Sequence, residues 1–102
     1  MRQAWVMKLK PGHEAEYKRK HDEIWPEMLE MMRKDCVRNY SIYRHGNTLF
    51  AYLERDTPAV EGKPAPDSII WRWWEMMAPH METNPDTSPV FEPVEEMFYF
   101  AG

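Results

Sequence analysis

The stretch that decides the fold is VRNYSIYRHGNTLFAYLE, residues 37–54. Residues 37–44 alternate in side-chain character, as a strand does, with Tyr40 on one of the two faces. The Gly-Asn pair at 46–47 has the chemistry of a tight hairpin turn, and residues 48–54 have the composition of its partner strand. The sequence therefore predicts a β-hairpin in the middle of the chain.

Upstream of the hairpin, residues 3–9 are rich in strand formers and apolar on both faces, which predicts another strand. From His13 onward, large side chains recur at spacings of three and four, which predicts a helix. These residues are Tyr17, His21, Ile24 and Met28. Pro26 does not fit a helix interior, so we expect a break near Asp22, which caps a second helical segment running to about Lys34.

Downstream of the hairpin, residues 57–67 carry three prolines and a glycine, and we expect an exposed loop there. A helix capped by Asp67 or Ser68 is expected to run through the apolar residues that follow and to end near Pro79. After a turn-rich stretch, residues 94–100 alternate and predict the last strand.

The order strand, helix, strand, strand, helix, strand predicts an α+β fold of the ferredoxin-like βαββαβ type, with a four-stranded antiparallel sheet and both helices on one face. We expect residues 1–102 to form a single domain. Several strands carry apolar residues toward both faces, as Phe50 and Leu53 do, although the helices cover only one face. We therefore expect either that the sheets of two chains pack together or that one face lines a ligand cavity.

Charge balance, cysteine content and the length of apolar runs limit the classes of partner and the cell compartment that we expect. Thirteen basic residues against 17 acidic ones give a net charge of 13 − 17 = −4, with both signs mixed along the chain. Nucleic acid is not expected as a partner, because a phosphate backbone needs clustered Lys and Arg. The lone Cys36 cannot form an internal disulfide and fits a reducing compartment. We find no apolar run of signal-peptide or membrane-spanning length, so we expect a cytoplasmic protein with no membrane partner.

Metal and cofactor sites are not expected either. The histidines and the cysteine lack the spacing of metal ligands, and the chain contains no glycine-rich nucleotide loop. His13, His45 and His80 fall at turns or helix ends, where solvent-facing polar residues are ordinary, and we assign them no role.

Aromatic residues surround the most interesting ionisable group. His21 lies one helical turn after Tyr17 and just ahead of an apolar cluster, so it can face a pocket, although a lone histidine at a helix end is ordinarily a surface residue. Trp73 and Trp74 point about 100° apart on a helix, so that one enters the core while the other lines a groove, unless both are core residues. Tyr40 can complete an aromatic wall that suits a sugar ring, or simply pack on its hairpin mate.

Several motifs in a fixed order carry a resemblance to a known family. They are YKRKHDEIWPEM (17–28), NYSIY (39–43), RWWEMM (72–77), NPDTSPV (84–90) and EEMFYF (95–100). As a set they make this chain resemble the L-rhamnose mutarotase family over most of its length. The resemblance implies a dimeric α+β barrel, in which two ferredoxin-like units pack sheet to sheet as a homodimer. It also implies that His21 is the catalytic proton donor and that four residues bind the sugar: Tyr17, Tyr40, Trp73 and Trp74.

The implied activity is that of an isomerase. It interconverts the α and β anomers of L-rhamnose, or of a related 6-deoxyhexose or aldohexose, with His21 as general acid/base in ring opening and closure. The chain departs from the family at residues 57–70, where the family continues as a helix with an aromatic residue ahead of the double tryptophan. This departure lies at the expected pocket rim. Two rival functions are a cofactor-free monooxygenase on the same barrel and a non-catalytic sugar-binding dimer module.

Overall fold

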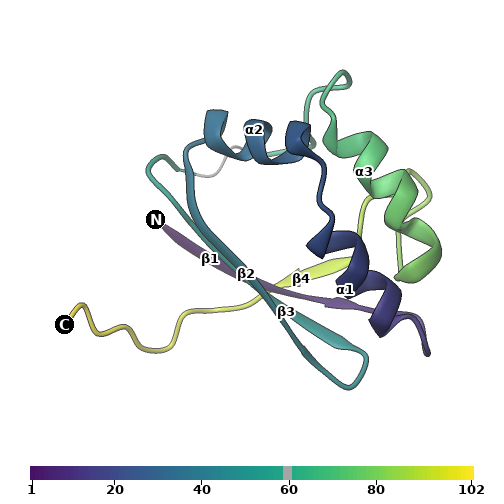
Figure 1. The fold of residues 1–102 in the computed structure, drawn as a ribbon. Coiled ribbons are helices and arrows are strands. Elements are labelled where there is room, and N and C mark those ends of the chain that lie inside the picture. The colour runs from purple at the N-terminus through teal and green to yellow at the C-terminus, as the bar shows by residue number, and fades with distance from the viewer. Residues whose placement is uncertain (59–60) are drawn as a thin grey trace.

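The computed structural model describes residues 1–58 and 61–102. Its elements, in chain order, are β1 (Arg2–Lys8), α1 (Glu14–Asp22), α2 (Pro26–Lys34), β2 (Val37–His45), β3 (Thr48–Arg55), α3 (Ile70–Met77), the 3₁₀ helix η1 (Ala78–His80) and β4 (Phe91–Pro93). The four strands form one antiparallel sheet in the order β2-β3-β1-β4. This is the strand order of the ferredoxin-like fold, so the predicted fold class is confirmed (Figure 1).

The central hairpin forms as its sequence predicts. β2 and β3 pair so that Tyr43 faces Phe50 and Ile42 faces Ala51 across the ladder. Gly46 has φ 61°, a left-handed conformation that glycine adopts without steric cost. The hairpin therefore follows from strand alternation joined to a local turn signal.

The predicted break between the first two helices is confirmed, but its cap is not. Asp22 ends α1, and its carboxylate accepts hydrogen bonds from Lys18 instead of capping α2. Trp25 is the N-cap of α2, with the extended angles φ −64° and ψ 138°, and Pro26 takes the first helical position. The residue before a proline is driven out of the helical region, so the chain restarts the helix at Pro26 and not at Asp22.

The helix that carries the two neighbouring tryptophans starts slightly later than predicted. α3 begins at Ile70, and the N–H of Ile70 donates to the hydroxyl of Ser68 at 3.3 Å. α3 ends at Met77, and Pro79 lies in η1, as expected for a proline that stops a helix. The described part of the predicted loop, residues 57, 58 and 61–67, is irregular, whereas residues 59 and 60 lie outside the described residues.

The last strand is shorter and earlier than predicted. Residues 94–100 are not a strand, because β4 covers only Phe91–Pro93 against β1. Proline has no N–H to give to the ladder, and pairing ends one residue later, where the Val94 N–H donates to the Ala4 carbonyl. The rest of the C-terminal segment leads away from the sheet (Figure 1).

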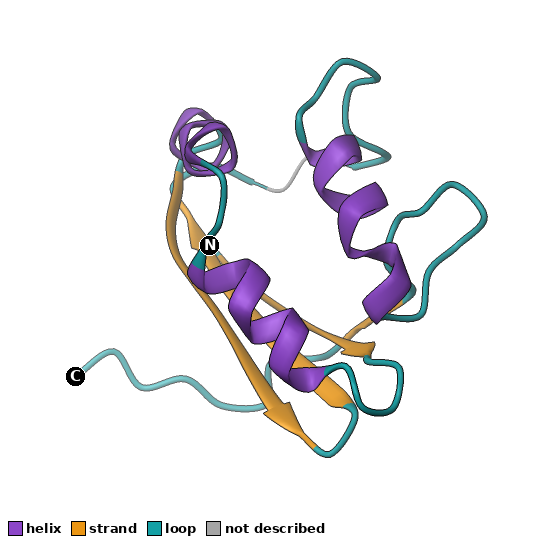
Figure 2. Cartoon of the chain, turned by 45° about the vertical axis from the view of Figure 1, so that its right-hand side comes forward, coloured by secondary structure: helices purple, strands orange, loops and turns teal. Residues whose placement is uncertain are grey.

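The described helices lie on one face of the sheet (Figures 1 and 2). The core between helices and sheet contains Met7, Leu9, Tyr17, Met28, Leu49, Ala51, Trp73, Met77 and Met81. On the opposite face of the sheet, Tyr43 is 67% exposed and Phe50 is 44% exposed. The apolar character of both faces, expected from the sequence, is therefore present in the structure.

The backbone conformation of Cys36 indicates that glycine at this position would stabilise the fold. Cys36 follows α2 in a left-handed conformation with φ 62°, and its N–H donates to the Arg33 carbonyl as a helix end requires. The substitution C36G removes the clash of a β-carbon in that conformation, and we expect the free energy of unfolding to rise by up to about 1 kcal/mol, or about 4–8 °C in Tm. Thermal denaturation measures it, with C36A as the control that loses the thiol but keeps the β-carbon. A Tm for C36G at or below that of C36A would contradict this account.

Candidate active site

His21 lies in the last turn of α1 and is partly buried between two aromatic rings. The centroid of its imidazole is 4.4 Å from that of Tyr17 and 5.3 Å from that of Trp73, whose ring it meets edge-on at 89°. The structure therefore brings together three of the five predicted site residues. His21 is not a fully solvent-facing residue of a helix end.

A single hydrogen bond determines the tautomer of His21. Its Nδ1 lies 3.0 Å from the backbone carbonyl oxygen of Tyr17. A carbonyl oxygen can only accept, so Nδ1 carries the proton, and Nε2 holds the lone pair of the neutral ring. Burial lowers the pKa of His21, against the smaller opposing effects of that hydrogen bond and of Asp22. The ring is therefore neutral near neutral pH, with Nε2 as a base.

The two predicted tyrosines remain protonated. Tyr17 is buried in the core, and burial, helped by the nearby Tyr40, raises its pKa. Tyr40 comes from β2, and its ring packs against Trp5 at 5.8 Å between centroids. Tyr40 as a residue is 40% exposed, and burial raises the pKa of its phenol to about 12. Both phenols can thus donate hydrogen bonds but do not act as bases.

The two neighbouring tryptophans separate, as their angular spacing predicts. Trp73 is buried and meets the ring of Trp25 edge-on at 5.2 Å, in addition to its contact with His21. Trp74 is only partly buried and packs against Trp71 at 5.1 Å, so the structure does not place its ring on His21. One indole supports the histidine while the other lies nearer the surface.

Sequence reasoning assigned no site role to Trp5 or Trp25, although both touch predicted site residues. Trp25 precedes Pro26, and the extended backbone that proline imposes was the available signal that this ring leaves the helical stripe. Trp5 shares a strand face with the core residues Met7 and Leu9, which was the signal for its inward position.

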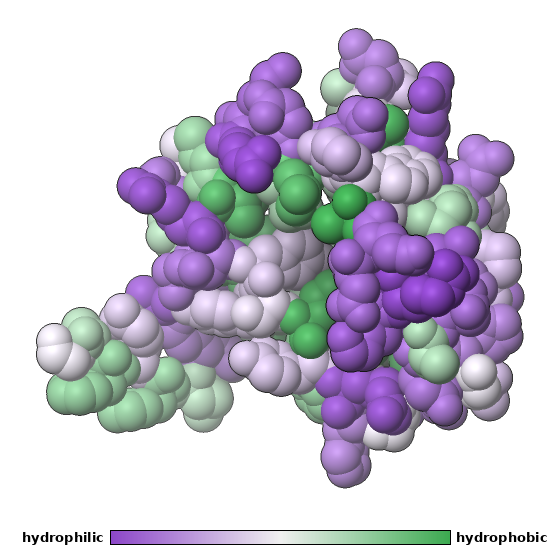
Figure 3. Space-filling model, viewed as in Figure 1, coloured by the Kyte–Doolittle hydropathy of each residue, from purple (hydrophilic) through white to green (hydrophobic). Residues whose placement is uncertain are grey.

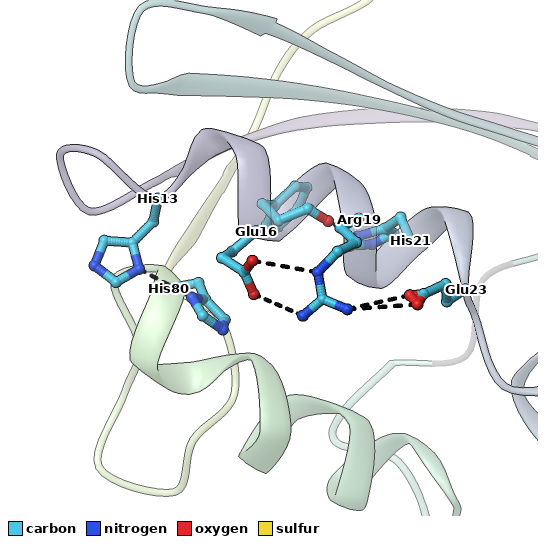
Figure 4. A network of polar contacts seen from close by, with 7 residues as sticks. His13, Glu16, Arg19, His21, Glu23 and His80 are labelled. Atoms are coloured by element: carbon cyan, nitrogen blue, oxygen red, sulfur yellow. Dashed lines mark hydrogen bonds and ion pairs between the residues drawn. The ribbon is translucent and has the colours of Figure 1, made fainter.

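The other histidines include one pair that the sequence did not predict. The Nδ1 atoms of His13 and His80 lie 2.9 Å apart, and both rings are partly buried (Figure 4). The expectation that these two residues are ordinary solvent-facing side chains is therefore wrong. They are 67 residues apart in the chain, and a contact at that separation leaves no local sequence signal.

Within residues 1–58 and 61–102, no group of three or more His, Cys, Asp or Glu side chains is arranged to hold a metal ion. Over the same residues, no helix has the length and apolarity needed to cross a membrane.

Comparison with known proteins gives one family over nearly the whole chain. A family model described as L-rhamnose mutarotase matches residues 2–100. The L-rhamnose mutarotase of Listeria monocytogenes EGD-e is 45% identical over 102 residues, covering 98% of each chain, and that of Bacteroides thetaiotaomicron is 42% identical, covering 96% of each. A crystal structure of an L-rhamnose mutarotase from Formosa agariphila superimposes with a TM-score of 0.87 at 40% identity, covering 98% of both chains. The chain therefore belongs to the L-rhamnose mutarotase family.

Proposed function

We propose that this protein is an isomerase that interconverts the α and β anomers of L-rhamnose, with His21 as the general acid/base. The activity is supported above all by full-length similarity to proteins of that name at 40–45% identity. The mechanism rests on the neutral His21 ring, whose Nε2 carries the lone pair beside a buried aromatic cluster. Those relatives do not favour the rival readings as a monooxygenase or a non-catalytic sugar-binding module.

The only steps of this reaction that a protein group has to assist are proton transfers. A proton leaves the anomeric hydroxyl, the bond between the anomeric carbon and the ring oxygen breaks, and the ring oxygen takes up a proton to give the open-chain aldehyde. Rotation about the bond next to the carbonyl exposes its other face, and the reverse steps close the ring as the other anomer. The two anomers contain the same atoms in the same oxidation state. The overall reaction therefore consumes no second substrate and transfers no electrons.

One imidazole can serve both proton transfers, because the anomeric and ring oxygens are bonded to the same carbon. Neutral His21 accepts the anomeric proton at Nε2, becomes an imidazolium, and delivers that proton to the ring oxygen. The tautomer held by the Tyr17 carbonyl makes base action the first step and acid action the second. A role as proton donor, implied by the family resemblance, is therefore the second half of this cycle.

The remaining predicted residues bind the sugar or support the base. Tyr17 and Tyr40 keep their phenolic protons and donate hydrogen bonds to sugar oxygens. Trp73 is buried against His21, so it supports the base, whereas the partly exposed Trp74 offers an indole surface for the apolar side of the sugar. A 6-deoxyhexose suits such a wall because its methyl group needs no hydrogen-bond partner.

The partner of this chain is a second copy of itself. After β4 the C-terminal segment carries large apolar side chains in solvent, with Met97 84%, Phe98 84% and Phe100 79% exposed, and it forms a hydrophobic extension in Figure 3. It is nevertheless held in a defined course, because the Arg2 guanidinium pairs with Glu96 at 2.9 Å and lies 3.4 Å over the Tyr99 ring.

A second copy would cover both this segment and the open face of the sheet. An exposed apolar surface of this extent is typical of a protein interface. Packing of the two open sheet faces, each covered in part by the other chain's C-terminal segment, satisfies both features at once. The proposed location is the cytoplasm, whose reducing conditions suit the free Cys36.

The role of His21 is tested by H21N. The asparagine amide takes the place of Nδ1 and keeps a donor for the Tyr17 carbonyl, but it has no counterpart of Nε2. We expect anomer exchange of L-rhamnose, measured by NMR saturation transfer, to fall by about 10²- to 10⁴-fold. H45N, which changes a histidine at the exposed hairpin turn, is the matched control and should exchange at the wild-type rate. Wild-type exchange by H21N would remove His21 from the mechanism.

The pH dependence of kcat follows from the same ring. The neutral form of His21 is the active one, and burial lowers its pKa below the ordinary value of 6.5. Falling pH protonates the ring, so kcat at saturating L-rhamnose should stay constant near neutral pH and drop only below about pH 6.5. Exchange rates corrected for the buffer reaction measure this. A kcat that rises on acidification would mean that the protonated ring starts the reaction.

The dimer is tested by F98S/F100S. Replacing two exposed phenylalanines with serine removes the apolar surface that a second copy would cover, so we expect the protein to sediment as a monomer at micromolar concentration. E95S, a change at another exposed position of the same segment, is the control and should leave the dimer intact. A wild-type protein that sediments as a monomer would refute the proposed interface.

A further inference from the structure

Two of the three histidines that the proposed mechanism does not use form a contact between the helices that carry the site. His13 is the N-cap residue of α1, and His80 is the last residue of η1, which directly continues α3. Their Nδ1 atoms are 2.9 Å apart, and their ring centroids are 5.1 Å apart (Figure 4). Both rings are partly buried, so this contact is shielded from solvent on some sides.

The contact requires one proton between two nitrogens. With a single proton on the facing Nδ1 atoms, one ring donates and the other accepts, whether the pair is neutral or carries one charge. With a second proton, two N–H groups of two cations would face each other at hydrogen-bond distance, and the bond is lost. The hydrogen bond between the two rings is therefore kept when one ring is charged and lost when both rings are charged.

Charged groups around the pair come from α1. The carboxylate of Glu16 favours a proton on His80, while Arg19 and Lys20 oppose it. Arg19 binds Glu16 with two hydrogen bonds, at 2.8 and 3.2 Å, and so takes up part of that negative charge. From the turn ahead of α1, Lys10 contributes its backbone N–H, which donates to the His80 carbonyl at 3.0 Å. Burial and the neighbouring His13 lower the pKa of His80, so the second proton enters only under acidic conditions.

The His13–His80 contact lies between the same two helices that hold His21 and Trp73. In Figures 1 and 2, α1 and α3 approach each other at the end where α1 starts and η1 follows α3, and they diverge toward the other end. The His13–His80 pair is at the narrow end, and the contact between His21 and Trp73 bridges the two helices farther along. The backbone hydrogen bond from Lys10 to His80 also lies at this narrow end.

We infer that His13 and His80 are positioning residues for the proposed active site: sharing one proton, they hold α1 against α3 so that His21, supported by Trp73, and the indole of Trp74 face one sugar. A second proton separates the rings and weakens sugar binding. This inference rests on the proposed function, and it predicts an effect on affinity that is separate from the effect of His21 on kcat.

Two substitutions of His80 test whether its hydrogen bond to His13 is what matters: one keeps a hydrogen-bonding group and the other removes it. In H80N the amide occupies the place of Nδ1 and can bond to His13 in either of its protonation states, whereas H80A has no group to offer. Binding of L-rhamnose is followed through tryptophan fluorescence from about pH 8 to about pH 5, the range in which histidines titrate. H45N is the control for loss of one histidine at a turn.

The expected results differ for each protein. The wild type and H45N should bind L-rhamnose about 3- to 10-fold more weakly at the acidic end, the change that one hydrogen bond is worth. H80N should lose this excess pH dependence, and H80A should bind weakly throughout. If H80A binds as tightly as the wild type, or if H80N retains the full pH dependence, the positioning role is wrong.

A second readout needs no sugar. Nitrogen-15 spectra of the imidazole rings should show a hydrogen bond between the Nδ1 atoms of His13 and His80 in the wild type near neutral pH, and the loss of that bond in H80A. Absence of that bond from the wild-type spectra near neutral pH would overturn the inference. A wild type that neither binds nor exchanges L-rhamnose would refute the proposed function instead, and the ring spectra would still decide whether the pair exists.

Discussion

The hydrogen bond from His21 Nδ1 to the Tyr17 carbonyl is the interaction on which the rest of the site depends. It assigns the protons of the ring, and it points the basic nitrogen away from the helix backbone. The helix break at Pro26 completes this arrangement, because α1 ends at Asp22, directly after His21, and leaves Trp25 free to reach Trp73. Because α1 ends directly after His21, the base, the Tyr17 carbonyl and the aromatic rings around them lie close together.

Local signals were enough to predict most of the fold. The hairpin follows from alternation around Gly46, and the helix break follows from Pro26, because each depends on a few neighbouring residues. The last strand was misplaced for the opposite reason. Residues 94–100 alternate as a strand should, but a strand also needs a backbone partner, and pairing with β1 ends next to Pro93.

The candidate site was predictable only in part. Tyr17 and His21 lie one helical turn apart, so their contact could be expected from spacing, and the divergence of Trp73 from Trp74 follows from helix geometry. The contacts of Trp5 with Tyr40 and of His13 with His80 join distant parts of the chain. Such contacts depend on how the helices settle on the sheet, and no local pattern encodes them.

The tautomer of His21 decides the order of the two proton transfers, because a neutral ring with its lone pair on Nε2 must act as a base before it acts as an acid. Nitrogen-15 chemical shifts of the His21 ring near neutral pH measure it directly, without substrate. The proposed mechanism requires a neutral ring that is protonated at Nδ1 and unprotonated at Nε2. A proton on Nε2 near neutral pH, in either a neutral or a cationic ring, would contradict it.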